Sequence, residues 1–402
     1  MDICDKSICT GCAACINSCN HNAIKMTKEY QGFFYPIVDE KKCVSCGLCK
    51  KVCPANCLSL PHRHIQVYAA LVKNDEERAK STSGGIFACL AKRVIQSGGY
   101  VYGAVLDSDL SVHHIEAHTY EEMERLRNSK YVQSDIGLCF QQAKKRLQSG
   151  KTVLFSGTPC QIAGLRNYLK KNYSNLLTID ILCHGVPSPG MFQKYRKNEE
   201  SLASSSLINI QFRTKSIGWK ENVTIRKFAN GRNADWADTF VPGFLSDYFL
   251  RQSCYSCHYS TDERQGDITL GDYWGYRETA PEYIEDDDKG ISLVIINTDK
   301  GKLAFQSIKR EIAFAKRTID DAKRGNAVLS KPCEKPKDYV SFWNDAANMD
   351  WNQLKEKYFQ EQAQTDWMSK ELREYYEIPF IKRYMKHKLV SIIKSVYHKL
   401  YK

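Results

Sequence analysis

Two kinds of segment are missing from this sequence of 402 residues, and each absence narrows the class of protein. No uninterrupted apolar run approaches the roughly 18 residues that a membrane-spanning helix needs. The opening residues, MDICDKSICTGC, lack the apolar stretch of a secretory signal. Both absences favour a cytoplasmic protein. A nucleic-acid-binding motif is missing as well, so we expect no nucleic-acid partner.

Cysteine, in contrast, is abundant. The chain has 17 cysteines, and ten of them lie within the first 57 residues. In a short secreted chain they would suggest disulfides, but in a large chain without a secretory signal they indicate metal or redox chemistry. The length exceeds what one hydrophobic core usually serves, so we expect two or three domains.

The N-terminal cysteines form two copies of one spacing, Cys-x2-Cys-x2-Cys-x3-Cys, which is typical of bacterial ferredoxins. In such repeats the first three cysteines of a copy bind one cluster, and the fourth binds the other. Zinc is the alternative, but two matched sets of four exceed what a tetrahedral zinc ion needs. We therefore predict one 4Fe-4S cluster on Cys9, Cys12, Cys15 and Cys53, and a second on Cys43, Cys46, Cys49 and Cys19.

Residues around these cysteines delimit the N-terminal unit. Gly11 and Gly47 lie inside the ligand loops, where a side chain would crowd a cluster. Cys4 and Cys57 fall outside the repeated spacing, and we expect neither to bind a metal. Two prolines and a basic stretch in PANCLSLPHRH mark the end of the unit near residues 58–65.

Downstream of this linker, strand-like and helix-like segments alternate, which is typical of an α/β sheet. The alternating segments are residues 65–72, 84–98, 100–106, 136–150, 151–157, 161–171 and 176–182. Strands and turns dominate further on, at 207–215, 223–231, 267–275 and 291–298. We therefore expect an α/β body, a second, β-richer domain, and a helical segment over 338–359.

A turn rich in serine and glycine opens one of these helices, at residues 83–85. A helix N-terminus offers free N–H groups, and glycines allow a phosphate to approach the backbone. An ordinary serine-capped helix explains the same pattern, and these residues alone favour it. Residues 127–135 form a second polar loop, with Ser129, Lys130 and Tyr131 inside it, which taken alone is no different from a surface turn.

Two cysteines follow predicted strands. Cys160 lies at the start of a helix, where N–H groups and the helix dipole stabilise a thiolate. Cys183 follows the next strand, and the carboxyl ends of such strands face the ligand crevice, so the two thiols could converge. The alternative for each is a buried free cysteine that acts as a small hydrophobic side chain. Cys254 and Cys257 form a separate Cys-x-x-Cys pair, which alone is two ligands short of a metal site.

Further motifs follow the two cluster spacings in a fixed order: STSGGIF, SKYVQS, SGTPCQ, CHGVPSP, CYSCHY and GDITLGDYWG. Over residues 1–330 the set resembles the coenzyme F-420 hydrogenase/dehydrogenase beta-subunit family, in the version fused to an N-terminal two-cluster ferredoxin. Members of this family bind FAD and a 4Fe-4S cluster, and they pass electrons between clusters and a deazaflavin through the flavin. The resemblance implies a ferredoxin domain over 1–60 and two parts of the body over 65–150 and 151–335. Outside the resemblance, we expect a helical basic extension over 336–402.

The resemblance also implies site residues. No protein nucleophile is required, and we assign no catalytic residue. His184 could move a proton or tune a cluster, although a structural role is favoured. A third 4Fe-4S cluster would bind Cys160, Cys183, Cys254 and Cys257. FAD would lie against Ser83, Gly84, Gly85, Ser129, Lys130, Tyr131, Gly271 and Asp272.

The expected function is that of an iron–sulfur flavoprotein oxidoreductase, which passes electrons between a hydride carrier, FAD and the clusters. The carrier would be coenzyme F-420-like or a nicotinamide, and a redox partner protein would take or supply the electrons. Two alternatives stay open. One is a non-catalytic subunit that relays electrons to a partner reductase, and the other is an accessory reductase of surface-polysaccharide biosynthesis.

The last residues of the chain suggest a basic amphipathic helix. Seven Lys or Arg and no acid lie between residues 381 and 402. Such a helix can lie on an anionic membrane surface or dock on an acidic partner. A terminal helix packed on the body, with a solvated basic face, is an equally good interpretation. The apolar face would consist of Met385, Leu389, Ile392, Val396 and Leu400.

Overall fold

The computed structural model describes residues 2–359 apart from 217, 221–222, 235–238, 277–283 and 285. The strands are β1 (Ile24–Lys28), β2 (Phe34–Val38), β3 (Gln66–Val72), β4 (Tyr100–Leu106), β5 (Val112–Ala117), β6 (Val153–Gly157), β7 (Leu176–Ile181), β8 (Leu207–Thr214), β9 (Val223–Phe228), β10 (Asn233–Ala234), β11 (Ile268–Asp272), β12 (Ser292–Ile296) and β13 (Ile312–Arg317). The α-helices are α1 (Ala14–Ser18), α2 (Leu48–Lys51), α3 (Asp75–Ala79), α4 (Ile86–Gln96), α5 (Tyr120–Arg125), α6 (Cys139–Gln148), α7 (Pro159–Leu169), α8 (Pro189–Ala203), α9 (Phe240–Leu245), α11 (Asp299–Ser307), α12 (Ile319–Gly325), α13 (Tyr339–Asn348) and α14 (Trp351–Tyr358). Two short 3-10 helices are η1 (Gln252–Ser256) and η2 (Ala327–Leu329).

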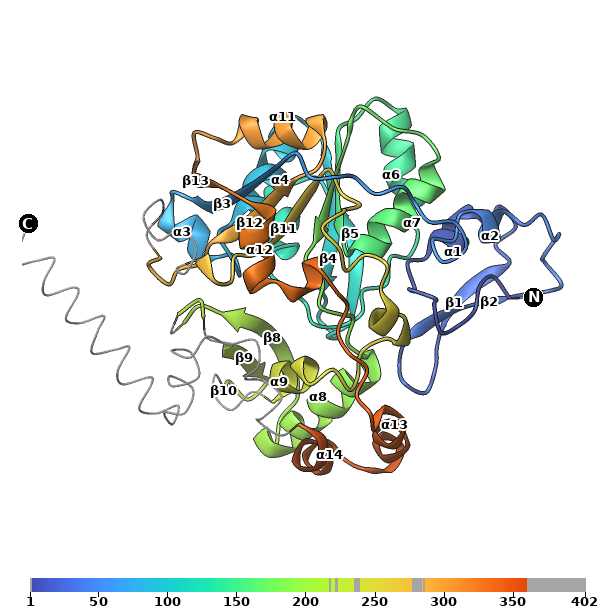
Figure 1. Cartoon of the computed structure of the whole chain (residues 1–402). Helices are drawn as coiled ribbons and strands as arrows, with labels where there is room; N and C mark the ends of the chain where they lie inside the picture. Colours follow the sequence, from blue (N-terminus) through green and yellow to red (C-terminus); the bar gives the residue numbers. More distant parts are fainter. Residues whose placement is uncertain are drawn as a thin grey trace, which may run out of the picture.

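An eight-stranded sheet forms the centre of the body, with the strand order β13-β3-β12-β11-β7-β6-β4-β5 (Figure 1). Strands β4, β6, β7 and β11 run parallel to one another, while β5 and β12 are antiparallel to their neighbours. Because β3 is antiparallel to β12, it points in the same direction as β11. The carboxyl ends of β3, β4, β6, β7 and β11 therefore meet at one edge of the sheet, which we call the carboxyl edge. Ligands of such sheets bind at this edge.

Helices cover both faces of the sheet. In β6, Leu154 packs with α4, α5 and α11, whereas Val153 and Phe155 pack with α6 and α7 on the opposite face. This alternation follows from the twofold period of a strand. All three side chains are buried, which explains why residues 151–157 read as a continuous apolar run instead of an alternating one.

The N-terminal unit consists of the antiparallel β1–β2 hairpin, the short helices α1 and α2, and the cysteine loops. Gly11 and Gly47 adopt φ angles of +68° and +72°, which glycine reaches without strain. The Asn17 side-chain amide donates a hydrogen bond of 2.9 Å to the Gly137 carbonyl oxygen and ties α1 to the loop before α6. The unit lies beside α6 and α7 (Figure 1).

A second unit lies below the main sheet in Figure 1 and contains α8, α9, α13, α14 and the small β10-β9-β8 sheet. Its core is aromatic. The ring centroids of Phe240 and Tyr195 are 5.2 Å apart, and Trp351 of α14 lies 5.3 Å from Tyr195. The segment 338–359 thus forms two helices that complete this core, which confirms its predicted helical character.

Most predicted elements are confirmed, including the strands of the body and the helices between them. The expectation of a separate β-richer domain needs a correction. Strand β11 pairs in parallel with β7, and β12 pairs with β3, so both complete the main sheet. The reason is that apolar side chains of β11 and β12 share one core with β6 and β7, while β12 and β3 share a second core on the opposite face.

The predicted amphipathic tail helix, residues 381–402, lies outside the described residues. Among the helices that the structure describes, none combines the length and the hydropathy of a membrane span.

Candidate iron–sulfur centres

Three segments bring the third predicted set of cysteines to the carboxyl edge of the sheet. Cys160 is the second residue of α7, which follows β6. Cys183 lies two residues after the end of β7. Cys254 lies in η1, and Cys257 directly follows this 3-10 helix. Two ligands thus come from neighbouring strand ends, and two come from one short turn.

The four thiols of the third set influence one another. Burial raises the pKa of Cys160 to about 11 and that of Cys254 to about 12, and the Cys257 thiolate adds to both shifts. Burial also raises the pKa of Cys183, and the other three cysteines raise it further. Metal ligands bind as thiolates, so cationic irons would offset this repulsion and desolvation. Four half-buried cysteines whose thiols influence one another fit the donor set of a 4Fe-4S cluster.

The first ferredoxin set gathers where the N-terminal unit meets the body. Cys9, Cys12, Cys15 and Cys53 are all buried. Burial raises the pKa of Cys12 to about 12, and Cys160, Cys53 and Cys9 raise it further. The pKa of Cys15 is raised by burial and then by the other three members of its set. These four residues therefore meet as the repeat spacing predicts.

Cys4 joins this first set, which the spacing did not reveal. Its thiol hydrogen-bonds with Cys9 and Cys53, and this contact is the main cause that lowers their pKa values to about 6 and about 7. The same two contacts raise the pKa of Cys4 itself. Sequence reasoning had no signal for this contact, because Cys4 precedes the repeat by an irregular interval. That Cys4 binds no metal stays a prediction.

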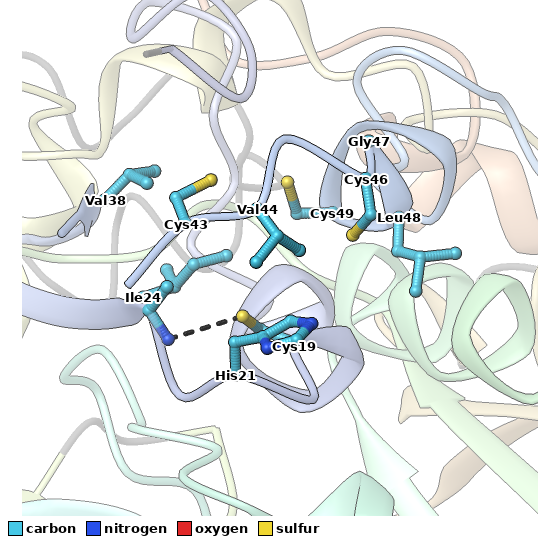
Figure 2. Close-up of a pocket in the computed structure, with 11 residues that line it drawn as sticks. Cys19, His21, Ile24, Val38, Cys43, Val44, Cys46, Gly47, Leu48 and Cys49 are labelled. Carbon is cyan, nitrogen blue, oxygen red and sulfur yellow. Dashed lines mark hydrogen bonds between the residues drawn. The ribbon is translucent and has the colours of Figure 1, made fainter. Parts of the chain in front are cut away.

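The second ferredoxin set lines a small pocket of about 20 Å3 (Figure 2). Cys19, Cys43, Cys46 and Cys49 all border it. The Ala23 N–H donates a hydrogen bond of 3.4 Å to the Cys19 sulfur, a contact of the kind that tunes ligating sulfurs. Cys46 is exposed, unlike the members of the first set. The second set is therefore the one that an outside molecule can approach.

The arrangement of the cysteines also bears on zinc. Within the described ranges, no group of three or more His, Cys, Asp or Glu side chains stands close enough to hold one metal ion. A 4Fe-4S cluster bonds each thiolate to a different iron, so its ligands stand farther apart than the four ligands of a zinc ion.

The first and third sets are neighbours across α7. A Cβ atom built on Gly164 would lie 2.9 Å from the Cys12 sulfur, so the absence of a side chain lets the ligand loop approach the helix. Gly164 lies four residues after Cys160 and therefore on the same helix face. The two sets thus share one face of α7, with one helical turn between their contact points.

The residues predicted to contact FAD gather at the same carboxyl edge. The Ser129 N–H donates a hydrogen bond of 3.3 Å to the Thr82 hydroxyl, which joins the loop at 129–131 to the turn at 83–85. Tyr131 hydrogen-bonds with Arg213, and Arg213 forms an ion pair with Asp272 at the end of β11.

Gly271 connects this region to the third set. A Cβ atom on Gly271 would lie 2.7 Å from the Leu182 side chain, and Leu182 precedes Cys183, a predicted ligand. The end of β11 therefore lies beside the third set of cysteines. The other predicted flavin residues come from the turn before α4 and from the loop after α5.

The turn at residues 83–85 is already packed. The Gly84 N–H donates a hydrogen bond of 2.9 Å to Ser292 Oγ, and a Cβ atom on Gly84 would lie 2.4 Å from the Ala70 carbonyl oxygen. Its N–H group faces the sheet, so this turn does not fit a phosphate. Lys130 is similarly engaged: it donates to the carbonyl oxygens of Arg125 and Arg127, and burial lowers its pKa to about 7.

Two other donors in this region do fit an anionic group. The Nε atoms of Arg127 and Arg213 are buried and have no hydrogen-bond partner within the part of the chain that the structure describes. Arg127 lies two residues before the loop at 129–131, and Arg213 hydrogen-bonds with Tyr131 of that loop. Buried donors of this kind need a partner, and the phosphates of FAD would supply one. Sequence analysis missed both residues because neither belongs to a recognised motif.

His184 is held in place by the second unit. Its Nε2 atom lies 2.5 Å from Asp247 Oδ1, and its ring packs edge-on against Phe244 at 5.2 Å between centroids. These contacts favour the structural role over that of a proton carrier.

Comparisons with known proteins match two parts of the chain to family models. Residues 150–322 match the family described as the C-terminal part of the coenzyme F-420 hydrogenase/dehydrogenase beta chain, and residues 8–57 match the 4Fe-4S dicluster domain. No curated protein matches the chain. Among solved structures, the xenon-derivatised F-420-reducing NiFe hydrogenase complex from Methanosarcina barkeri is similar. It shares 16% identity over 68% of this chain and 91% of that chain, with a TM-score of 0.45.

Proposed function

We propose that this chain, which belongs to the coenzyme F-420 hydrogenase/dehydrogenase beta-subunit family and carries an N-terminal 4Fe-4S dicluster domain, passes electrons in line along three 4Fe-4S clusters. The third set of cysteines holds the cluster at the carboxyl edge, the first ferredoxin set holds the middle one, and the second ferredoxin set holds the outer one. The observation that carries this order is the contact of Cys12 with Gly164, one helical turn from Cys160.

FAD would bind at the carboxyl edge, beside the third set. A bound flavin takes two electrons from a hydride and releases them one at a time, which matches the single electron that each cluster carries. Arg127 and Arg213 would bind its phosphates with their unpaired Nε–H groups. The residues at 129–131 and Asp272 would border the cofactor. The packed turn at 83–85 would form part of the wall without binding a phosphate.

The hydride carrier would be coenzyme F-420 or a nicotinamide, and a redox partner protein would dock at the second ferredoxin set. Cys46 is exposed there, and Val44 is 58% exposed. Residues 41–51 contain four lysines and no acid. A basic rim around an apolar centre favours a partner with an acidic surface, because complementary charge speeds and orients docking.

The test of this function is the anaerobic reduction of the reconstituted chain. Reduced coenzyme F-420 and NAD(P)H are added separately, and the flavin and cluster absorption bands are followed. We expect one of the two donors to bleach the flavin band first and the cluster bands afterwards. No bleaching with either donor would refute the proposed carriers.

One observation favours a second function, the relay subunit without a flavin. The packed turn at 83–85 leaves fewer free N–H donors for a phosphate than the motif suggests. A chain that binds no flavin after reconstitution, but keeps its clusters, would support the relay and refute the flavoenzyme.

A matched pair of variants tests the flavin contact. Arg213→Lys keeps a positive charge beside Asp272 but lacks the Nε–H donor, so we expect flavin affinity to fall about tenfold, as loss of one charge-assisted hydrogen bond predicts. Arg93→Lys changes an exposed arginine that pairs with Glu311, and it should leave flavin affinity unchanged.

A further inference from the structure

A buried guanidinium lies between the first and third sets of cysteines. Arg251, three residues before Cys254, is fully buried. Its Nε–H donates a hydrogen bond of 2.6 Å to the Cys9 carbonyl oxygen. Its guanidinium carbon lies 4.0 Å from the ring centroid of Tyr35 and 5.5 Å from that of Phe33. The side chain therefore reaches from the segment that carries the third set into the N-terminal unit that carries the first.

The charge of Arg251 has no carboxylate partner among the described residues. Its NH1 and NH2 atoms are buried without a hydrogen-bond partner, and neither stacked ring carries a negative charge. A Cβ atom on Gly11 would lie 3.2 Å from NH1, so the ligand loop is built around this guanidinium. Burying an unpaired cation is strongly unfavourable. The position therefore calls for an anionic group beside NH1 and NH2.

Arg251 contacts predicted ligands of both sets. Its side chain donates to the backbone of Cys9, and its own carbonyl oxygen accepts a hydrogen bond of 2.8 Å from the Cys254 N–H. In agreement with this position, the charge of Arg251 opposes the rise that burial causes in the pKa values of Cys160 and Cys254.

We propose that Arg251 is a shared counter-charge for the first and third clusters and raises the reduction potential of both. This inference rests on the proposed three-cluster function. A 4Fe-4S cluster gains one negative charge when it is reduced, so a fixed cation beside it stabilises the reduced form. In each transfer one electron leaves one cluster, which is oxidised, and reduces the other. No proton or further reactant is needed. A cation placed between the two clusters keeps their potentials close in either direction of transfer.

The test uses the full-length chain, reconstituted anaerobically, with Arg251→Gln and Arg251→Lys. The potentials of the three clusters are measured by redox titration monitored by EPR. In Arg251→Gln we expect the potentials of the first and third clusters to fall, while that of the second stays unchanged. Arg251→Lys keeps the positive charge and should show a smaller fall. The second cluster serves as the control within the same molecule.

Two outcomes separate this inference from the function on which it rests. Three unchanged potentials in Arg251→Gln, with the iron content of the unmodified chain, would overturn the role of Arg251 and leave the three clusters in place. An unmodified chain with iron for only two clusters would refute the three-cluster function itself.

A second measurement does not depend on whether the glutamine variant assembles its clusters. The unmodified chain is labelled with 15N-arginine, and nitrogen couplings to the reduced clusters are recorded by pulsed EPR. A coupling from labelled arginine that disappears in Arg251→Lys would support the proposed contact. Labelled protein without such a coupling would overturn it.

Discussion

Replacing Gly164 with alanine should disturb the contact between the first and third clusters. The new Cβ atom would lie 2.9 Å from the Cys12 sulfur and 3.1 Å from the Cys12 Cβ atom. Ordinary carbon–carbon contacts begin at about 3.5 Å, so the overlap with the Cys12 Cβ atom is about 0.4 Å, and the overlap with the larger sulfur atom is greater. Overpacking of this kind costs about 1–3 kcal/mol. Alanine in a helix interior gains about 1 kcal/mol over glycine. The net loss of stability is therefore about 0–2 kcal/mol, and we expect it to destabilise the loop that holds the first cluster.

The assay is the release of iron to a chelator under anaerobic conditions. We expect Gly164→Ala to release about four of about twelve irons faster than the unmodified chain does, by up to about 30-fold if the full loss falls on the first cluster. Gly164→Val, with a larger side chain, should release them faster still. Equal release from the unmodified chain and both variants, or equal acceleration of all irons, would refute the contact across α7.

Three other predictions follow from particular residues. Burial lowers the pKa of His114 to about 4 from 6.5, so the folded state binds fewer protons than the unfolded state, and stability is lost as pH falls through this window. His114→Asn should remove about 3 kcal/mol of that loss, measured by urea unfolding at pH 7 and pH 4. The same loss of unfolding free energy between pH 7 and pH 4 in both proteins would contradict this prediction. Trp351 is 1% exposed in the aromatic core, so Trp351→Ala should lower the free energy of unfolding in urea by about 3–5 kcal/mol. The control Leu60→Ala changes an exposed side chain and should cost less than about 0.5 kcal/mol. Equal urea midpoints for the two variants would refute the role of this core. Cys57 is exposed and lies outside all three sets, so Cys57→Ala should keep its full iron content, while Cys53→Ala should lose about four irons per chain. Loss of iron from Cys57→Ala would show that the ligand assignment is wrong.

The N-terminal sets were predictable because three cysteines of each set are close in sequence and the repeated spacing points to the fourth. The three at short intervals meet where the loop between them is tight, and Gly11 and Gly47 provide the turns. The main sheet was also predictable, since each buried strand such as β6 reads as an apolar run between helices.

Contacts between distant segments were not predictable from local pattern. Periodicity gives no sign that Cys12 packs on Gly164, or that Arg251 reaches the Cys9 carbonyl oxygen. The joining of Cys160 and Cys183 to the pair at Cys254 came only from the family resemblance. The expectation of a separate β-richer domain was wrong for β11 and β12, which join the main sheet, while β8 and β9 do form a separate small sheet. Strand spacing does not specify which sheet a strand enters.

The most direct test of the three-cluster function is the iron and acid-labile sulfide content of the anaerobically reconstituted chain and of its Cys254→Ala/Cys257→Ala variant. The account predicts about twelve irons in the unmodified chain and about eight in the variant, with the ferredoxin EPR signals retained. About eight irons in both proteins, or zinc lost from the variant with iron unchanged, would contradict it.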